Sequence, residues 1–569
     1  MKDRDTIKWL YKITKKQIPT IIMLSLSNAA LAAIGVVIAL LSKKVIDSAV
    51  RVAAGKGEQS YTQLIIYGCL IFMIISLRVI TRIVTQSLSV KAQARMEMGM
   101  RAKMFKSILD KDYSKISVYH SGELMNRLTS DIAIVSNGMV NMVPDTTYII
   151  VQFTGAFVAL IFFDWKFALV FVFGGVVVFT IIGLFKTKLK YLHKLVQQTD
   201  GKARSFFQEN IESLLIVKTF GIQDEVTAKG NELQEDNYNA KMKRRKVNIY
   251  ANAGFGFVFN IGYLYALMWC SFKLCTKTMT YGTLTAVLQL INQVQMPVVN
   301  FTKLFPQLFG ILASAERIME VESLMDEKLG VESVDVEKTY DSMKKIVFDE
   351  VKFGYKSDLS NKRESVLDGG TVEISKGEFV AIRGISGIGK STLLKMLLGV
   401  FKPDEGKIAI IDDNGKEIEA NVATRDMFSY VPQGNYLFSG TLRDNLKLVN
   451  PIATDEEMEE ALKVSESYDF IKTFPDGLDT VIGEKGLGLS EGQVQRMAIA
   501  RAVVCKSPII LLDEATSALD YETEVKVLNN IRALKNRTCV IITHKQAAID
   551  VCDKEIVIEK KMLKMNKKK

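Results

Sequence analysis

The chain has 569 residues, of which 48% are hydrophobic and 24% are charged, and its formal net charge is +11. Because a single hydrophobic core rarely grows beyond about 250–300 residues, we expect more than one domain. The mean hydropathy of +0.14, combined with this many charges, indicates a membrane part joined to a soluble part. The lysines and arginines gather beside apolar runs, as in cytoplasmic loops of membrane proteins, which argues against nucleic acid as a partner.

The first expected element is an interfacial helix over residues 1–17, where lysines alternate with Ile7, Trp9 and Leu10. The apolar run that follows starts too late and continues too long for a cleavable signal peptide. A transmembrane helix needs about 20 mostly apolar residues. Six stretches can supply them, at 19–42, 62–85, 135–162, 164–186, 250–275 and 283–310.

Two long helical segments between these spans carry too many charges to cross lipid, one after the second span and one after the fourth. The positive-inside rule places both segments, and the amino terminus, in the cytoplasm. Lys43, Lys44, Arg51 and Lys56 in the first outer loop oppose this orientation, which therefore rests on the larger inner loops. The sequence predicts an all-α six-helix transmembrane domain over residues 18–319, followed by a linker over 320–345.

From residue 346 to 569, short apolar runs alternate with helical ones, which predicts an α/β domain with buried strands. One apolar run, 379–382, leads into a full GxxxxGK[ST] phosphate loop and then a helix start, which is the context that supports this motif. Such a loop surrounds phosphates with backbone N–H groups, while its lysine reaches the β and γ phosphates and its serine binds Mg²⁺. The expected ATP-binding residues are Gly384, Ser386, Gly387, Gly389, Lys390, Ser391 and Thr392.

A second apolar run, 509–512, leads into Asp513 and Glu514. A carboxylate at the end of a buried strand can hold Mg²⁺, which is the role expected of Asp513. Glu514 would then lie beside the terminal phosphate and could polarise the attacking water. Alone, an acidic pair after a strand is usually a solvated turn, but the phosphate loop upstream favours catalysis. We therefore expect a P-loop enzyme that hydrolyses a nucleoside triphosphate with Mg²⁺.

Further motifs resemble, in order and spacing, those of the ATP-binding-cassette (ABC) transporters. They are the adenine-stacking loop ending at Tyr355, the Q-loop ending at Gln433, the signature Leu489-Ser490-Glu491-Gly492-Gln493, the D-loop Ser517-Ala518-Leu519-Asp520 and the switch histidine His544. Residues 122–131 and 209–221 resemble the cytoplasmic extensions of the exporter-type membrane domain. The resemblance therefore covers nearly the whole chain and implies an exporter-type half-transporter.

The resemblance also implies a role for each motif. Tyr355 would stack on adenine, Gln433 would join Ser391 and Asp513 around Mg²⁺, and His544 would contact the γ phosphate. The residues implied to act on the nucleotide of a partner chain are Ser490, Gly492, Gln493 and Asp520. One set of motifs per chain implies two chains, most simply a homodimer, while a related half-transporter as partner stays open.

Glu491 departs from the glycine that is usual at this position of the signature. A carboxylate 4 Å from a phosphate would repel it by roughly 1–4 kcal/mol, depending on the effective dielectric. We therefore expect the side chain of Glu491 to point away, with lower nucleotide affinity or altered closure at most and with activity retained. The lysine-rich tail after Ile558 is expected to be solvated.

The implied function is ATP-driven transport by an alternating-access dimer in a lipid bilayer, in a bacterial cytoplasmic membrane with the ATPase domain in the cytoplasm. Export of a peptide-like, lipid or amphipathic small molecule is expected, and a nucleotide-gated regulator or channel, or an importer on the same fold, is the alternative. Residues 113–119 and 213–220 are expected to transmit the motion. Polar residues of the sixth span face either a cavity or another helix; they are Gln289, Asn292, Gln293, Gln295 and Asn300.

Overall fold

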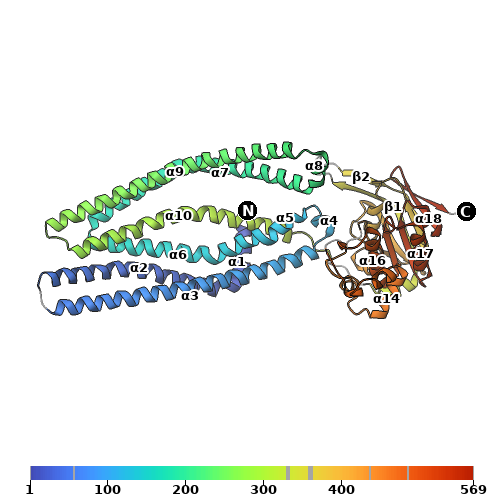
Figure 1. Ribbon diagram of the computed structural model, residues 1–569, viewed down its shortest axis with the longest axis horizontal. Coiled ribbons are helices and arrows are strands. Elements are labelled where there is room, and N and C mark those ends of the chain that lie inside the picture. Colours follow the sequence, from blue (N-terminus) through green and yellow to red (C-terminus); the bar gives the residue numbers. More distant parts are fainter. Residues whose placement is uncertain are drawn as a thin grey trace. The chain divides into compact units, whose positions relative to one another are not determined.

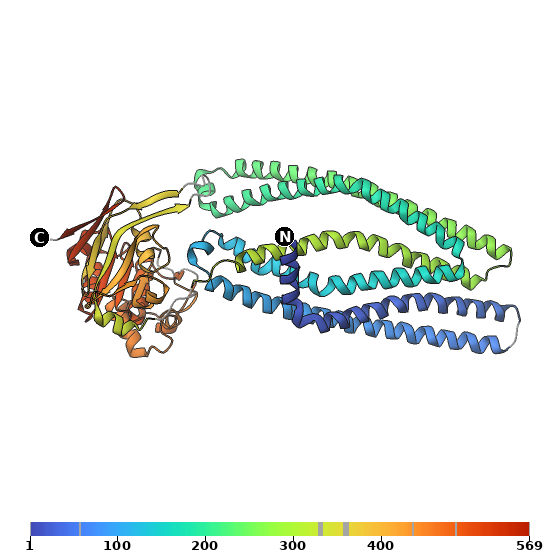
Figure 2. The same ribbon diagram turned by 180° about the vertical axis from the view of Figure 1, so that it is seen from behind.

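The computed structural model describes residues 2–55, 58–327, 334–356, 363–434, 437–483 and 486–567. They form two compact units (Figures 1 and 2), each built from two stretches of chain. The first unit comprises Met1–Phe105 and Ser121–Glu320, and the second comprises Lys106–His120 and Val321–Lys569. The segment 106–120, which the sequence suggests is part of the membrane domain, thus belongs with the second unit.

The first unit is helical throughout its described residues. Its helices are α1 (Lys2–Thr14), α2 (Ile18–Ala53), α3 (Glu58–Asp110), α5 (Ser121–Asn126), α6 (Ile132–Phe163), α7 (Trp165–Glu212), α8 (Leu214–Phe220), α9 (Gln223–Cys275) and α10 (Tyr281–Glu322). The longest of them run side by side, with α7 along α9 and α2 along α6. Both α3 and α10 start in this unit and end inside the second.

Among the described residues, four stretches are long and apolar enough to cross a membrane: Arg4–Ala53, Tyr61–Asp110, Ser121–Phe163 and Gln223–Cys275. They contain the first, second, third and fifth expected spans. The fourth and sixth, 164–186 and 283–310, lie within α7 and α10, where several side chains are outside the described residues. Those two spans stay predictions, as does the interfacial position of α1.

Close helix contacts in the first unit depend on small residues. At Gly138 in α6, an added Cβ would lie 2.2 Å from Cδ1 of Ile311 in α10, and at Gly282 it would lie 2.2 Å from the carbonyl oxygen of Lys43. Without side chains at these points, the helix backbones can approach closely, which is the usual way in which membrane helices pack. Ala39, Ala156 and other residues of this core are fully buried.

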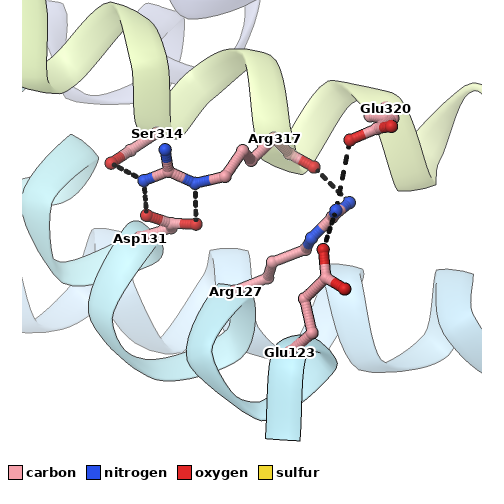
Figure 3. A network of polar contacts seen from close by, with 6 residues as sticks. All are labelled: Glu123, Arg127, Asp131, Ser314, Arg317 and Glu320. Atoms are coloured by element: carbon pink, nitrogen blue, oxygen red, sulfur yellow. Dashed lines mark hydrogen bonds and ion pairs between the residues drawn. The ribbon is translucent and has the colours of Figure 1, made fainter. Parts of the chain in front are cut away.

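A network of charged groups joins the start of α6 to the end of α10 (Figure 3). The side chain of Asp131, 2% exposed, accepts two hydrogen bonds from Arg317, one of them from Nε at 2.8 Å. Arg127, 3% exposed, donates to the carbonyl oxygen of Arg317 at 2.8 Å, to Glu123 at 2.6 Å and to Glu320 at 3.1 Å. A π-helical turn runs from Arg127 to Asp131. Such irregularities of a helix are common at functional sites.

The second unit combines helices with two large sheets and a small third one, in which β8 (Gly440–Thr441) pairs with β9 (Val481–Ile482). One sheet has the order β13-β12-β4-β11-β10-β7, with β4 (Phe379–Arg383), β7 (Phe428–Val431), β10 (Ile509–Asp513), β11 (Thr538–Ile542), β12 (Lys554–Glu559) and β13 (Met562–Lys567). The other has the order β2-β1-β5-β6, with β3 also paired to β1; its strands are β1 (Met343–Lys356), β2 (Arg363–Asp368), β3 (Val372–Ser375), β5 (Glu405–Asp412) and β6 (Glu417–Glu419). The helices are α4 (Tyr113–Ile116), α11 (Val336–Ser342), α12 (Lys390–Leu397), α13 (Leu442–Lys447), α14 (Asp455–Val464), α15 (Tyr468–Lys472), α16 (Glu491–Val504), α17 (Tyr521–Ala533) and α18 (Gln546–Val551).

The core of the second unit lies on both faces of the first of these sheets. Leu511 of β10 packs in a cluster with α12 and β1, whereas Leu512 packs in another with α16 and α17. Successive residues of a strand point to opposite faces, so a strand buried on both sides reads as a continuous apolar run. This confirms the predicted α/β unit that follows a helical one.

The expectation of a solvated tail is wrong for its first part. Met562–Lys567 forms β13, which pairs antiparallel with β12 along its whole length, and Leu563 is 4% exposed. The alternation of Leu563 and Met565 with Lys564 and Asn566 gives the segment one apolar face, which packs on the core. Lysine content alone was therefore a poor guide. Lys569 lies outside the described residues.

We expect Arg317→Met to destabilise the first unit by about 3 kcal/mol. Removing one partner of a buried ion pair leaves the other charge buried without a partner, which costs roughly 3–5 kcal/mol. Because Arg317 is 46% exposed, we expect an effect at the low end of this range. Thermal unfolding in detergent measures this. Arg204→Met is the control, because its ion pair with Asp200 is exposed and 3.6 Å long. Equal melting temperatures for the two variants would contradict the assignment.

Candidate nucleotide site

The phosphate loop follows β4 and needs glycine at several positions. Gly384, Gly387 and Gly389 have φ angles of +157°, +78° and +109°, which side chains rarely allow. At Gly389 an added Cβ would also lie 2.4 Å from Cγ1 of Val366. Backbone conformation and space therefore both require glycine there, immediately before α12 begins at Lys390.

The side chain of Lys390 folds back onto the phosphate loop and binds its backbone. This side chain is buried, and Nζ donates to the carbonyl oxygens of Gly384 at 2.9 Å and Ile385 at 3.2 Å. The first residues of α12 also leave backbone N–H groups without helical partners, and the N-terminal end of a helix favours an anion. Ammonium and N–H groups together make a site for phosphate.

Asp513 is the last residue of β10 and its side chain is buried. Ser391 Oγ donates to Oδ1 and the Tyr430 hydroxyl donates to Oδ2, each at 3.0 Å. Burial raises the pKa of Asp513, and these two hydrogen bonds act in the opposite direction. The carboxylate, the serine hydroxyl and the amide of Gln433 are oxygen ligands of the kind that Mg²⁺ prefers, so these residues fit a magnesium ion.

Glu514 lies at a strained turn that directly follows β10. Its φ is +51°, and its N–H donates to the carbonyl oxygen of Ile542, the last residue of β11, at 3.1 Å. A residue other than glycine in this conformation costs about 1–3 kcal/mol, and such strain gathers at functional sites. Gln433 Nε2 donates to Glu514 Oε2 at 2.8 Å, and Nε2 of His544 lies 4.0 Å from Glu514 Oε1. The three side chains therefore meet beside Asp513.

Tyr355 lies at the edge of the phosphate-loop helix. Its hydroxyl is 2.9 Å from Oγ1 of Thr392, and its ring meets Phe353 and Phe401 edge to face, with centroids 5.1 and 5.7 Å apart. Tyr113 of α4 packs on Phe401 at 6.2 Å. Tyr355 is 40% exposed as a residue, so its ring can still offer a face to adenine. No motif of the sequence points to Phe401, whose ring contacts Tyr113, Phe353 and Tyr355.

The signature and D-loop residues form a second group. Ser490 is the N-cap of α16, where it and Gln493 exchange hydrogen bonds of 3.3 and 2.9 Å in a capping box. Asp520 caps α17, and the N–H of Thr523 lowers the pKa of its carboxyl. Glu491 is exposed in the first turn of α16.

Gln495 links the signature helix to the D-loop, a role that the sequence did not suggest. It is 1% exposed, donates to Ser517 Oγ and accepts from the N–H of Ala518, each at 2.9 Å. Gly492 lies close to the same loop, since an added Cβ would be 3.3 Å from the carbonyl oxygen of Ala518. The D-loop is thus held on α16.

Comparisons with known proteins agree with this arrangement. Residues 20–298 match the family model of the ABC transporter transmembrane region, and residues 367–517 match that of the ABC transporter. A bacterial Atm1-family ABC exporter, solved with ATP bound, has a TM-score of 0.80 and 22% identity over 97% of this chain and 94% of its own, which shows the shared fold.

Two relatives extend the comparison. An ATP-binding/permease protein of Staphylococcus aureus with a provisional multidrug-export name is 29% identical over 92% of this chain and 90% of its own length. A mitochondrial ABC transporter B family member of Arabidopsis thaliana is 31% identical over 68% of this chain, although the match spans only 56% of the plant protein.

The chain belongs to the ABC transporters. Within them it is an exporter-type integral membrane protein, whose ATP-binding unit is an ATPase coupled to transport.

We expect Lys390→Met to weaken ATP binding by at least about tenfold, because a hydrogen bond to a charged group is worth roughly 1.5–3 kcal/mol. Titration of the purified protein with a fluorescent ATP analogue measures the affinity. Lys402→Met removes an exposed lysine just beyond α12 and should leave the affinity unchanged. Equal affinities of all three proteins would contradict the phosphate-loop assignment.

Proposed function

We propose that two copies of this chain form an exporter of amphipathic, lipid or peptide-like molecules in a bacterial cytoplasmic membrane. The observation that carries the proposal is the meeting of Ser391, Asp513, Gln433, Glu514 and His544 at one edge of the sheet. The similarity to bacterial relatives of export type supports a bacterial membrane as the location and export as the direction of transport.

In the proposed reaction, phosphates bind the N–H groups of residues 384–391 and the ammonium of Lys390, while adenine stacks on Tyr355. Ser391, Gln433 and Asp513 would hold Mg²⁺, which would supply positive charge to stabilise the phosphate oxygens. Glu514 accepts the proton of the attacking water, and His544 donates a hydrogen bond to the γ phosphate. The strained backbone at Glu514 and its hydrogen bond to Ile542 fix the base before ATP arrives.

The second group of residues acts in trans. Ser490, Gly492, Gln493 and Asp520 lie on α16 and on the loop before α17, and they bind the nucleotide of the partner chain. Each chain carries one set of both groups, so a C₂ homodimer gives two identical, complete sites. Such an isologous interface is the commonest arrangement for homo-oligomers.

The cargo is inferred from α10. Gln293 donates to the carbonyl oxygen of Gly35 at 2.9 Å and Gln295 to that of Phe259 at 3.1 Å, so these two amides serve helix contacts. Gln289 and Asn292, one turn apart, are exposed and share a face. Polar groups on an otherwise apolar helix suit an amphipathic cargo.

We expect Glu514→Gln to bind ATP as the wild type does but to lose hydrolysis, because the amide cannot accept the proton. General-base catalysis contributes roughly 10²–10⁴-fold, so kcat should fall by about that factor. ATPase assays measure the loss of hydrolysis. ATP-dependent uptake of amphipathic dyes into inside-out vesicles measures the loss of transport that should accompany it. Glu460→Gln, which changes an exposed glutamate of α14, is the control. Normal turnover in Glu514→Gln would refute the role of Glu514.

We expect Glu491→Gly to lower the KM for ATP by about twofold to tenfold, since it removes a negative charge near the partner's phosphate while exposure and solvent weaken that repulsion. Steady-state ATPase at varied ATP concentration gives KM. Glu456→Gln removes a charge from the first turn of α14, outside both groups, and should not change KM. An unchanged KM in Glu491→Gly would argue against the trans position of the signature.

A further inference from the structure

The segment Val321–Glu327, which the sequence predicts to be part of a linker, makes many hydrogen bonds within the second unit. Lys111, next to the end of α3, has a side chain that is 5% exposed. Its Nζ donates to the carbonyl oxygens of Glu322 at 2.8 Å and Leu324 at 2.7 Å, and to Asp326 Oδ1 at 2.6 Å. An ammonium has three donors, so all of them are used on this one segment.

Backbone hydrogen bonds hold the same two pieces of chain together. The N–H of Asp112 donates to the carbonyl oxygen of Met325 at 3.0 Å, and that of Glu327 donates to the carbonyl oxygen of Asp110 at 2.9 Å. Lys111 and Asp326 form an antiparallel bridge between them. The segment thus pairs with the chain that leaves α3.

The next contact leads to the phosphate-loop helix. Glu327, 16% exposed, forms a two-fold ion pair with Arg425, at 2.9 and 2.7 Å. Arg425 Nε also donates to the carbonyl oxygen of Leu398 at 3.0 Å. Leu398 is the C-cap of α12, the helix that begins with Lys390, and cations favour this end of a helix.

We propose that Lys111, Val321–Glu327 and Arg425, here named the strap, are a relay between the ATP site and the membrane helices. The strap joins the ends of α3 and α10, both of which start in the first unit, to the end of α12. Lys111, Glu327 and Arg425 are positioning residues in this proposal, which rests on the proposed function. Energetic coupling is carried by such contiguous hydrogen-bonded groups when they bias a two-state element.

The tryptophans allow a test without a known cargo. The chain has three, Trp9, Trp165 and Trp269, and all lie in the first unit. Their emission therefore reports the membrane helices, while ATP hydrolysis reports the second unit. Wild-type protein in nanodiscs should change its emission on addition of Mg-ATP and vanadate.

For Arg425→Glu we expect hydrolysis within about twofold of wild type but an emission change at least about fivefold smaller, since the relay is cut while the ATP site is intact. The charge swap Glu327→Arg with Arg425→Glu should recover at least half of the emission change. Lys111→Met should behave as Arg425→Glu does, and Lys111→Arg should recover. Lys338→Met is the control, because its pair with Asp335 is exposed, at 85% and 53%.

Three results would contradict the proposed role of the strap as a relay. The first is a full emission change in both Arg425→Glu and Lys111→Met. The second is a parallel loss of hydrolysis, melting temperature and emission change that the charge swap does not restore, which would make the contacts merely structural. The third is an equal loss in Lys338→Met. Hydrolysis by the wild type with no emission change at all would instead refute the proposed transport cycle.

Discussion

The buried carboxyl group of Asp513, with hydrogen bonds from Ser391 and Tyr430, is the point around which the ATP-binding unit is arranged. The two donors come from α12 and β7, so three elements meet at one buried group. Burying a charge is costly unless it is paired, and two neutral donors offset only part of that cost. The remaining cost favours a cation at this place, which explains why an acidic group is tolerated at the end of a fully apolar strand.

The order of the strands brings the rest of the site to the same edge. β4, β11, β10 and β7 are adjacent and parallel, and ligands of such sheets bind at the carboxyl ends of the strands. The phosphate loop, His544, Glu514 and Gln433 follow these four strands in turn. The hydrogen bond from Glu514 to Ile542 joins the ends of β10 and β11, and so it also sets the distance from Glu514 to His544.

The helical unit and the α/β unit are predictable from the sequence, because apolar runs, loops and spacing are local signals. The proximity of Ser391 to Asp513 is predictable for the same reason, whereas the hydrogen bond from Tyr430 is not. Phe401, Gln495 and Arg425 are not predictable either, because each matters only through a partner distant in the sequence. The lysine-rich tail misled for a related reason, since one apolar face was enough to make β13 a strand. The role of Gln293 needed the position of Gly35 to be known.

The energies of the contacts at the end of α10 suggest how this helix moves. Breaking a buried ion pair costs roughly 3–5 kcal/mol, whereas a ligand at a hundred times its Kd supplies only about 2.7 kcal/mol. Arg317 ties α10 to Asp131, and five residues later Glu322 accepts from the buried ammonium of Lys111. Nucleotide binding therefore supplies less free energy than the loss of the Arg317–Asp131 pair would cost. In the proposed cycle it shifts an equilibrium between two arrangements that both keep this pair, so α10 keeps its contact with the start of α6.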